Sequence, residues 1–396
     1  MAQVPQTFFD ALAVRTWCGL ALETLGRARE EIDAINVYPV ADGDTGTNLY
    51  LTVESAVAAV EAVFAGHAAG AEAAMGAGSE GAGVADAGGA GEPTLADAAR
   101  AMAHGALIGA RGNSGTILAQ LLRGMAQVLA DDDTARADGR CLRLALRHAA
   151  DSARRAVAHP VEGTVLTVAS AAADAADGAE GDCGTVVRAA YDGARTALAA
   201  TPGQLPVLER AGVVDAGGRG LVAVLGALVE TFTGERERTR GVAGSAYTGP
   251  AGDLHARVEA VDGHAPADGA RGECADSAAA VPGQEGPAFE VIYLLEAEDA
   301  AVERLRGRLD ALGDSLVVVG GDGLWNVHVH VDDAGAAVEA GIEAGRPHRI
   351  RITHFGAGDV HTTGAERPPR ERAQRAVVAV VPGEGLAGLY AEAGAT

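Results

Sequence analysis

The chain has no lysine: all 31 basic residues among its 396 residues are arginines. Without an ammonium group, the chain cannot be a P-loop enzyme, a Schiff-base enzyme or a kinase with a strand-borne catalytic lysine. Positive charge is scarce overall, since the formal net charge is −23. That balance argues against nucleic acid or an anionic membrane surface as the main partner. A phosphate-binding site in this chain would need metal ions, backbone amides or arginine.

Cysteine is also rare, and the four cysteines lie far apart with no CxxC pair. This spacing argues against a zinc ribbon or a disulfide framework and fits a reducing cytosol. No basic segment precedes the first apolar residues, and no apolar run approaches the ~20 residues that span a bilayer. We therefore expect a cytoplasmic protein without an integral membrane segment. Aromatic residues make up only 4% of the chain, which predicts cores of small aliphatic side chains.

Composition divides the chain into a helical part and a smaller mixed part. From Phe8 to about Glu230 apolar residues recur at helical spacing, whereas strand-like and helical stretches alternate from about residue 287. The pattern predicts an all-α helical bundle followed by a small α/β (α+β) domain. The predicted boundaries are a helical domain over 5–233 with a mobile Gly/Ala-rich insertion at 65–91, a flexible linker over 234–286, a middle domain over 287–364, and the start of an incomplete third domain over 376–396.

The most informative segment is NVYPVADGDTGTN at residues 36–48. Asp42 and Asp44 flank a glycine, and two carboxylates this close favour a shared cation such as magnesium. The free amides at the start of the following helix offer an anion site. An Asp/Gly turn that only caps a helix is the structural alternative. An EF-hand is excluded, because position six is Thr47 instead of glycine and position twelve is Val53 instead of glutamate.

Three further glycine-rich turns precede helical stretches. GARGNSG at residues 109–115 supplies Asn113 and Ser114 as N-cap candidates and Arg111 as a cation for phosphate. The other two turns are EGT at residues 162–164 and DAGGRG at residues 215–220. Each turn alone could be an ordinary corner between helices. Together, they could converge at one end of a helical bundle.

His328 and His330 form an HxH pair within a predicted strand at residues 325–331. Strand alternation places both imidazoles on one face and the valines on the other. Such a pair suits a metal if a third ligand is nearby, and Asp332, Asp333 and His354 are the candidates. A polar surface patch is the structural alternative.

Four segments in order resemble the DAK2 (dihydroxyacetone kinase L-type) family: INVYPVADGDTGTN, GARGNSGTILAQ, EGTVLTV and VVDAGGRGLV. The closer resemblance is to the ATP-binding subunit of bacterial fatty acid kinases. LGDSLVVVGGDGLWNVHVHVDD is similar to the middle domain of those proteins, and VVAVVPGEGLAGLYAEAGAT to the beginning of their third domain.

The resemblance implies a helical bundle that binds ATP and Mg²⁺ at one end, with Asp42 and Asp44 as metal-binding, catalytic residues. It implies transfer of the γ-phosphoryl group to the carboxylate of a fatty acid held by a separate fatty-acid-binding carrier protein. A homodimer is a further expectation. The alternatives are a non-catalytic nucleotide-binding scaffold and a glycerone (dihydroxyacetone) kinase-type subunit. The residues expected to shape the nucleotide pocket are Thr45, Gly46, Thr47, Asn48, Arg111, Gly112, Asn113, Ser114, Gly115, Gly163, Thr164, Asp215, Gly217, Gly218 and Arg219.

The chain departs from the family pattern at two candidate ligands. Dihydroxyacetone kinases have a third metal-binding aspartate upstream of the turn, and the residue that stands in its place here is Asn36. The family's HxH motif binds zinc together with a cysteine on the first strand of the middle domain. The matching residues 287–290 contain no cysteine, so the resemblance leaves His328 and His330 without their third zinc ligand.

Overall fold

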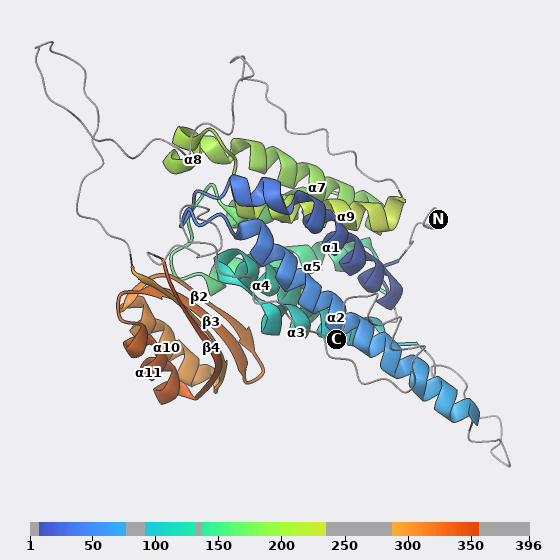
Figure 1. Cartoon of the computed structure of the whole chain (residues 1–396). Coiled ribbons are helices and arrows are strands. Elements are labelled where there is room, and N and C mark those ends of the chain that lie inside the picture. Colours follow the sequence, from blue (N-terminus) through green and yellow to red (C-terminus); the bar gives the residue numbers. More distant parts are fainter. Residues whose placement is uncertain (1–7, 77–91, 131–135, 235–286, 356–396) are drawn as a thin grey trace, which may run out of the picture. The chain divides into compact units, whose positions relative to one another are not determined.

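We describe the protein from a computed structural model, which places residues 8–76, 92–130, 136–234 and 287–355. The first three of these ranges are helical throughout, as predicted (Figure 1). The helices are α1 (Ala11–Ala34), α2 (Thr45–Gly76), α3 (Leu95–Gly109), α4 (Gly112–Leu129), α5 (Gly139–Ala156), α6 (Val165–Asp177), α7 (Cys183–Ala200), η1 (Thr201–Gly203), α8 (Pro206–Ala211) and α9 (Ala216–Thr233).

The core of this bundle consists mainly of alanine, leucine and valine, with Trp17 among the largest fully buried side chains. Small residues let the helices approach closely. A Cβ added at Gly124 of α4 would lie 2.7 Å from the Ala149 Cα of α5, and one added at Gly105 of α3 would lie 2.5 Å from the Ser55 carbonyl oxygen of α2. The low aromatic content therefore corresponds to helices packed through small side chains.

Two details of the predicted helical domain are wrong. α2 continues to Gly76, so the first part of the predicted insertion at 65–91 is helical; its alanines are strong helix formers. α4 begins at Gly112 with Arg111 at the N-cap position, so Asn113 and Ser114 lie in the first turn instead of capping it. The rest of the insertion, the predicted linker from residue 235 and the predicted third domain lie outside the described residues.

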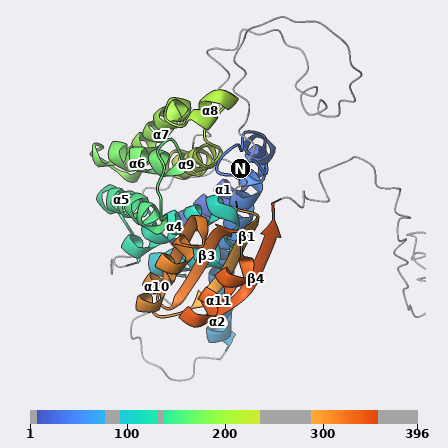
Figure 2. The ribbon, with the colours of Figure 1, turned by 90° about the vertical axis from the view of Figure 1, so that its left-hand side faces the viewer.

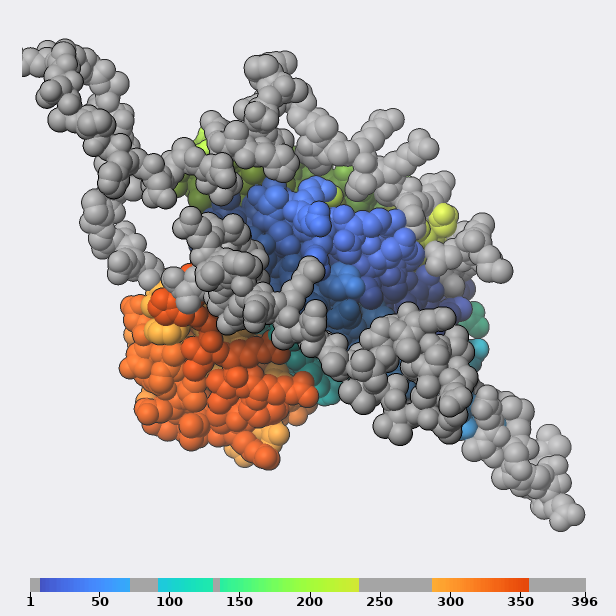
Figure 3. Space-filling model, in the orientation of Figure 1, coloured from blue at the N-terminus to red at the C-terminus, as the bar shows by residue number. Residues whose placement is uncertain are grey.

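The second folded part is a four-stranded sheet with two helices, in agreement with the predicted small α/β domain. β3 pairs antiparallel with both β1 and β2, and the strand order is β2-β3-β1-β4 (Figure 2). The elements are β1 (Phe289–Glu296), α10 (Asp299–Asp310), β2 (Gly313–Gly321), β3 (Leu324–Val331), α11 (Ala334–Ala344) and β4 (Arg346–His354). The strand β4 was not predicted; it lies at the sheet edge, is largely exposed, and is part of the orange-to-red surface in Figure 3.

The sheet packs against the bundle through alternate residues of β2. Val317 and Val319 belong to the bundle core, whereas Leu316 and Val318 belong to the core beneath α10 and α11. Hydrogen bonds join the two parts: Asn326 Nδ2 donates to the Leu107 carbonyl at 3.1 Å. The Ala158 backbone N–H donates to the Leu316 carbonyl, also at 3.1 Å. The described residues up to Thr353 therefore form one compact unit.

One segment of α2, Thr45–Ala71, is long and apolar enough to cross a membrane by length and composition alone. No such run was expected from the sequence. In the structure this helix packs against α1 and α3, and its Glu61 pairs with Arg15 of α1 at 2.6 Å. Helices that pack in a protein core pass the same length test, so this segment is weak evidence for a membrane span.

Candidate functional site

The starts of four helices meet at one end of the bundle, as the glycine-rich turns suggested. Two adjacent cavities are lined by residues from the starts of α2, α4, α6 and α9, and both include Pro39, Asn113 and Ser114. Helix N-termini present free amides and partial positive charge. The convergence therefore concentrates anion-binding groups in one place without any lysine.

The smaller cavity has a volume of about 20 Å³ and holds the predicted metal-binding residues. Asp42 and Asp44 line it together with Asn36, whose Nδ2 donates to Asp42 Oδ1 at 2.5 Å. The Asn36 side chain is buried, and its Oδ1 has no hydrogen-bond partner among the described residues. A space of this size holds about one water molecule or ion, and the donor set is all oxygen, which suits magnesium. The third predicted ligand position thus lies at the site.

The electrostatics of this cavity favour a bound cation. Burial, followed by the nearby charge of Asp42, raises the pKa of Asp44 to about 7. The same two causes raise the pKa of Glu290, on β1, to about 7. Carboxylates that are hard to ionise in the bare protein ionise readily once a divalent cation neutralises them. The site therefore has unbalanced negative charge that a metal would relieve.

Residues around the DGD turn fix its shape. Asp33, at the end of α1, accepts hydrogen bonds from the Thr47 backbone N–H at 3.0 Å and from the Thr47 hydroxyl at 2.8 Å. Gly46 packs so tightly on α1 that an added Cβ would lie 2.3 Å from the Arg29 carbonyl oxygen. Thr47 and Gly46, predicted as nucleotide contacts, therefore anchor the turn to α1. Asp33 was not predicted, because no motif residue marks its position fourteen residues upstream of Thr47.

Two other predicted residues at the small cavity shape the start of α4. Gly112 adopts φ +54°, and an added Cβ would lie 2.4 Å from Asn48 Nδ2, so only glycine fits there. Asn48 lines the cavity beside Asp44. Thr45 also lines it, and its hydroxyl lies 3.5 Å from the Ser114 hydroxyl. Gly115 packs against Thr52 behind the cavity wall.

The second cavity has a volume of about 90 Å³, enough for a phosphate-sized group. Thr164, the N-cap of α6, and Asp215, the N-cap of α9, both line it, as does Gly217. Asp215 Oδ2 accepts from the Gly218 backbone N–H at 2.6 Å, and burial raises the pKa of Asp215 to about 7. The predicted residue Gly163 has φ +81° and forms the turn before Thr164.

The two predicted arginines do not line either cavity. Arg219 Nε donates to Glu31 of α1 at 3.0 Å. The backbone N–H of Arg111 donates to the Thr52 hydroxyl, and its Nε is buried without a hydrogen-bond partner among the described residues. In this conformation, the helix starts and the carboxylates form the cavity walls without an arginine.

The HxH pair is buried, so the surface-patch alternative is wrong. His328 is 0% exposed and His330 is 4% exposed, and their Nε2 atoms lie 3.0 Å apart. Burial lowers the pKa of both imidazoles, most strongly that of His328. A neutral imidazole has a free ring nitrogen for a metal.

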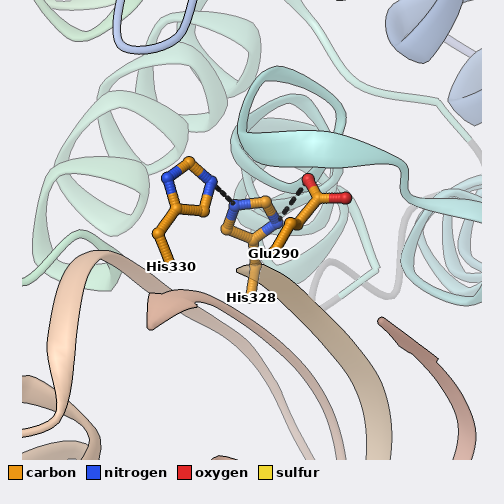
Figure 4. Close-up of side chains that lie close together, drawn as sticks. All are labelled: Glu290, His328 and His330. Carbon is orange, nitrogen blue, oxygen red and sulfur yellow. Dashed lines mark hydrogen bonds and ion pairs between the residues drawn. The ribbon is translucent and has the colours of Figure 1, made fainter. Parts of the chain in front are cut away.

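A third donor to this pair comes from β1. Glu290 Oε1 lies 3.7 Å from His328 Nδ1, and one ligand atom of each of the three residues lies within 4.8 Å of the others (Figure 4). The antiparallel register places Glu290 opposite His330. Of the predicted third ligands, Asp332 accepts from the Ala288 backbone N–H and Asp333 caps α11, and His354 is not in the group.

Glu290 and His330 connect the two groups of residues, because both also line the small cavity with Asp42 and Asp44. From the sequence, these groups were expected to be separate sites in separate domains. Their proximity depends on the packing of the sheet against the start of α2 and α4. The site is therefore built by both folded parts of the chain.

Comparison with known proteins identifies both folded parts. Residues 74–230 match the DAK2 domain, and residues 286–361 match the FakA-like middle domain of the fatty acid kinases. The DAK2 match begins after the turn that carries Asp42 and Asp44.

Curated relatives align over nearly the whole chain. Protein YloV of Bacillus subtilis is 29% identical over 388 residues, and an uncharacterized protein of Staphylococcus haemolyticus is 28% identical over 392 residues. Each alignment covers 94% of this chain and 62% of the relative. The chain thus spans less than two thirds of the length of these relatives.

Proposed function

Because the chain carries a DAK2 domain followed by a FakA-like middle domain of the fatty acid kinase type, we propose that it is an ATP- and magnesium-dependent kinase component. Its product would be an acyl phosphate, formed on the carboxylate of a fatty acid that a carrier protein presents. The observation that carries the proposal is the convergence of four helix starts on a buried, acidic, ion-sized cavity. We place this activity in the cytoplasm and expect the chain to act as a homodimer.

The residues of the small cavity suit the metal part of this chemistry. Asp42 and Asp44 would hold magnesium, and the Asn36 carbonyl oxygen would add a neutral ligand. Magnesium supplies charge neutralisation during phosphoryl transfer, which otherwise requires little covalent chemistry from the protein. A lysine is unnecessary if the metal and the helix amides together balance the phosphate charge.

The neighbouring helix starts would orient the phosphates. Free backbone amides of α4, α6 and α9 surround the second cavity, next to Asn113 and Ser114. The enclosed volume of about 90 Å³ is far below the several hundred Å³ that a nucleotide-sized ligand needs. Ser315 and Val317 of β2 form part of its wall, so we expect this wall to move outward when the whole nucleotide binds.

The middle domain would contribute a second metal centre. Glu290, His328 and His330 provide one carboxylate and two imidazoles, a donor set typical of zinc. Glutamate would thus replace the cysteine of the family pattern. The centre would hold β1 and β3 together beside the magnesium site and keep Glu290 in place.

The proposal is tested by supplying the chain with Mg-ATP, a fatty acid and a fatty-acid-binding carrier protein, and trapping the acyl phosphate with hydroxylamine. We expect the hydroxamate to form with the wild-type chain and to be lost in D42N/D44N. The matched control is D182N, which changes an exposed helix-capping aspartate on α7. ATP binding without any hydroxamate would instead support a non-catalytic nucleotide-binding scaffold. Phosphorylation of dihydroxyacetone in place of the fatty acid would support the glycerone kinase-type alternative.

A further inference from the structure

A larger cleft, which the proposed function does not use, lies between the bundle and the sheet. Its volume is about 1100 Å³, and its walls come from α4 and α5 on one side and from α10, β2 and β3 on the other. It shares a wall with the phosphate-sized cavity: Ala156 and Val318 line the cleft, whereas their neighbours Val157 and Val317 line the cavity. The cleft is therefore separate from the proposed metal site but adjacent to it.

Basic side chains gather in this cleft although the whole chain has a formal charge of −23. Arg155 is exposed and has no hydrogen-bond or ion-pair partner among the described residues. Arg306 donates from its two Nη atoms to the carbonyls of Ala156 and Val318, while its Nε has no hydrogen-bond partner there. The acidic residue in the lining is Glu303, 3.6 Å from Arg306 Nε. The guanidinium of Arg155 thus remains available for a ligand.

A buried amide in the same lining also lacks a partner. Gln120 is only 9% exposed; its Nε2 donates to the Ser152 hydroxyl at 2.9 Å, and its Oε1 has no hydrogen bond among the described residues. If the amide is turned over, the nitrogen is the atom left without a partner. Either way, a buried polar atom that lines the cleft is unsatisfied, which is uncommon in the absence of a ligand or water.

The rest of the cleft offers an apolar surface. Trp325 lines it and is 9% exposed, and its indole N–H donates to the Ala297 carbonyl at 3.1 Å. Val128 and Val318 add aliphatic surface beside it. Ligand sites typically combine such apolar walls with a few fixed polar groups.

We propose that this cleft binds an organic anion: a small molecule with a phosphate or carboxylate group and an apolar body. Arg155 and the free side of Arg306 would contact the anionic group, and the Gln120 amide would contact a polar atom of the ligand. The apolar body would lie against Trp325 and the valines. This proposal does not depend on the kinase activity, because the cleft and the magnesium cavity have no lining residue in common.

The test is a fluorescence titration of the full chain with phenyl phosphate and, separately, with phenylacetate. EDTA is present throughout, so that the proposed metal sites do not contribute. The chain has two tryptophans, and Trp17 is buried in the bundle at 2% exposure, so a change in emission reports on Trp325. The W325F variant should lose the emission change. Benzyl alcohol, which has the apolar body without the charge, is the ligand control.

We expect saturable binding of at least one anion, weakened about tenfold or more in R155Q. The matched control R140Q changes an exposed arginine in the first turn of the same helix, α5, and should bind like the wild type. Circular dichroism confirms that each variant is folded. Binding of only one of the two anions identifies the chemical group that the cleft recognises. Absence of saturable binding, equal affinity in R155Q, or equal binding of benzyl alcohol would overturn the proposal.

Discussion

Asn36 donates a hydrogen bond of 2.5 Å from its Nδ2 to Asp42 Oδ1, and its own Oδ1 is left buried without a partner among the described residues. The amide therefore supports one proposed metal ligand while it offers an oxygen to the same cavity. A carboxylate at this position would add negative charge beside Asp42 and Asp44.

This arrangement predicts the effect of the N36D substitution. Without metal, a third carboxylate should lower the free energy of unfolding by about 1–3 kcal/mol, because like charges are buried together. Saturating Mg²⁺ should recover most of that loss, since the added charge strengthens cation binding. Thermal unfolding of N36D and wild type, each in EDTA and in Mg²⁺, measures both effects. Equal Mg²⁺ stabilisation of the two proteins would show that residue 36 is not at a magnesium site.

Asp215 predicts how stability depends on pH. Burial raises its pKa in the folded chain to about 7, above the 3.8 that is ordinary for an aspartate. The stabilising contribution of the protonated group is complete below about pH 4 and is lost as the pH rises through 7. D215N keeps a good helix cap but cannot ionise, so it should be more stable than the wild type at pH 8, by up to about 4 kcal/mol.

The control for Asp215 is D182N, which should shift stability in the opposite direction. Hydrogen bonds from the backbone and hydroxyl of Thr185 lower the pKa of Asp182. Its ionised form is therefore stabilising at neutral pH, and that contribution is lost as the pH falls through the folded-state pKa. Urea unfolding across pH 4 to 8 compares the two variants. A D215N variant less stable than the wild type at pH 8 would contradict the assigned cause.

The buried triad predicts a zinc site. We expect the wild-type chain to bind one Zn²⁺ at this site, E290Q to bind it at least about tenfold more weakly, and E290C to retain it because thiolate is a strong zinc ligand. Competition with a chromogenic chelator measures these affinities. The control E296Q changes an exposed glutamate at the end of the same strand. Unchanged zinc affinity in H328A/H330A would place the metal elsewhere.

The small size of the second cavity predicts a movement of β2. The Ala158 backbone N–H is bonded to the Leu316 carbonyl, beside the Val157–Val317 bridge that forms part of the wall. If a nucleotide displaces this wall, the Ala158 amide should exchange its hydrogen faster in the presence of Mg-ATP. Hydrogen–deuterium exchange measures the rate. Slower exchange in a chain saturated with Mg-ATP would mean that the nucleotide binds without opening this wall.

Local pattern was enough to predict part of this site. The DGD turn, the four helix starts and the facing imidazoles follow from short-range rules of helix capping and strand alternation. Glu290 could not be found this way, because its approach to His328 depends on the β1–β3 register. Its place in the Asp42 cavity depends further on how the sheet packs on the bundle. Asp33 was missed for a similar reason, since only the contact between α1 and α2 brings it to Thr47.

The extent of α2 and the strand β4 show two other limits of local pattern. The alanine-rich start of the predicted insertion continues the helix, although its composition resembles that of a loop. In β4, Arg349, Ile350, Arg351 and Ile352 alternate, yet all four are exposed, so the strand lacks the buried face that usually marks one in a sequence.

Calorimetric titration of the chain with ATP tests directly whether Asp42 and Asp44 hold the magnesium through which ATP binds. We expect the wild type and D182N to bind ATP with Mg²⁺ and to lose most of that affinity in EDTA. We expect D42N/D44N, shown to be folded by circular dichroism, to bind at least about a hundredfold more weakly in Mg²⁺. Wild-type affinity in D42N/D44N, or ATP binding that is indifferent to EDTA, would rule out this role for the two aspartates.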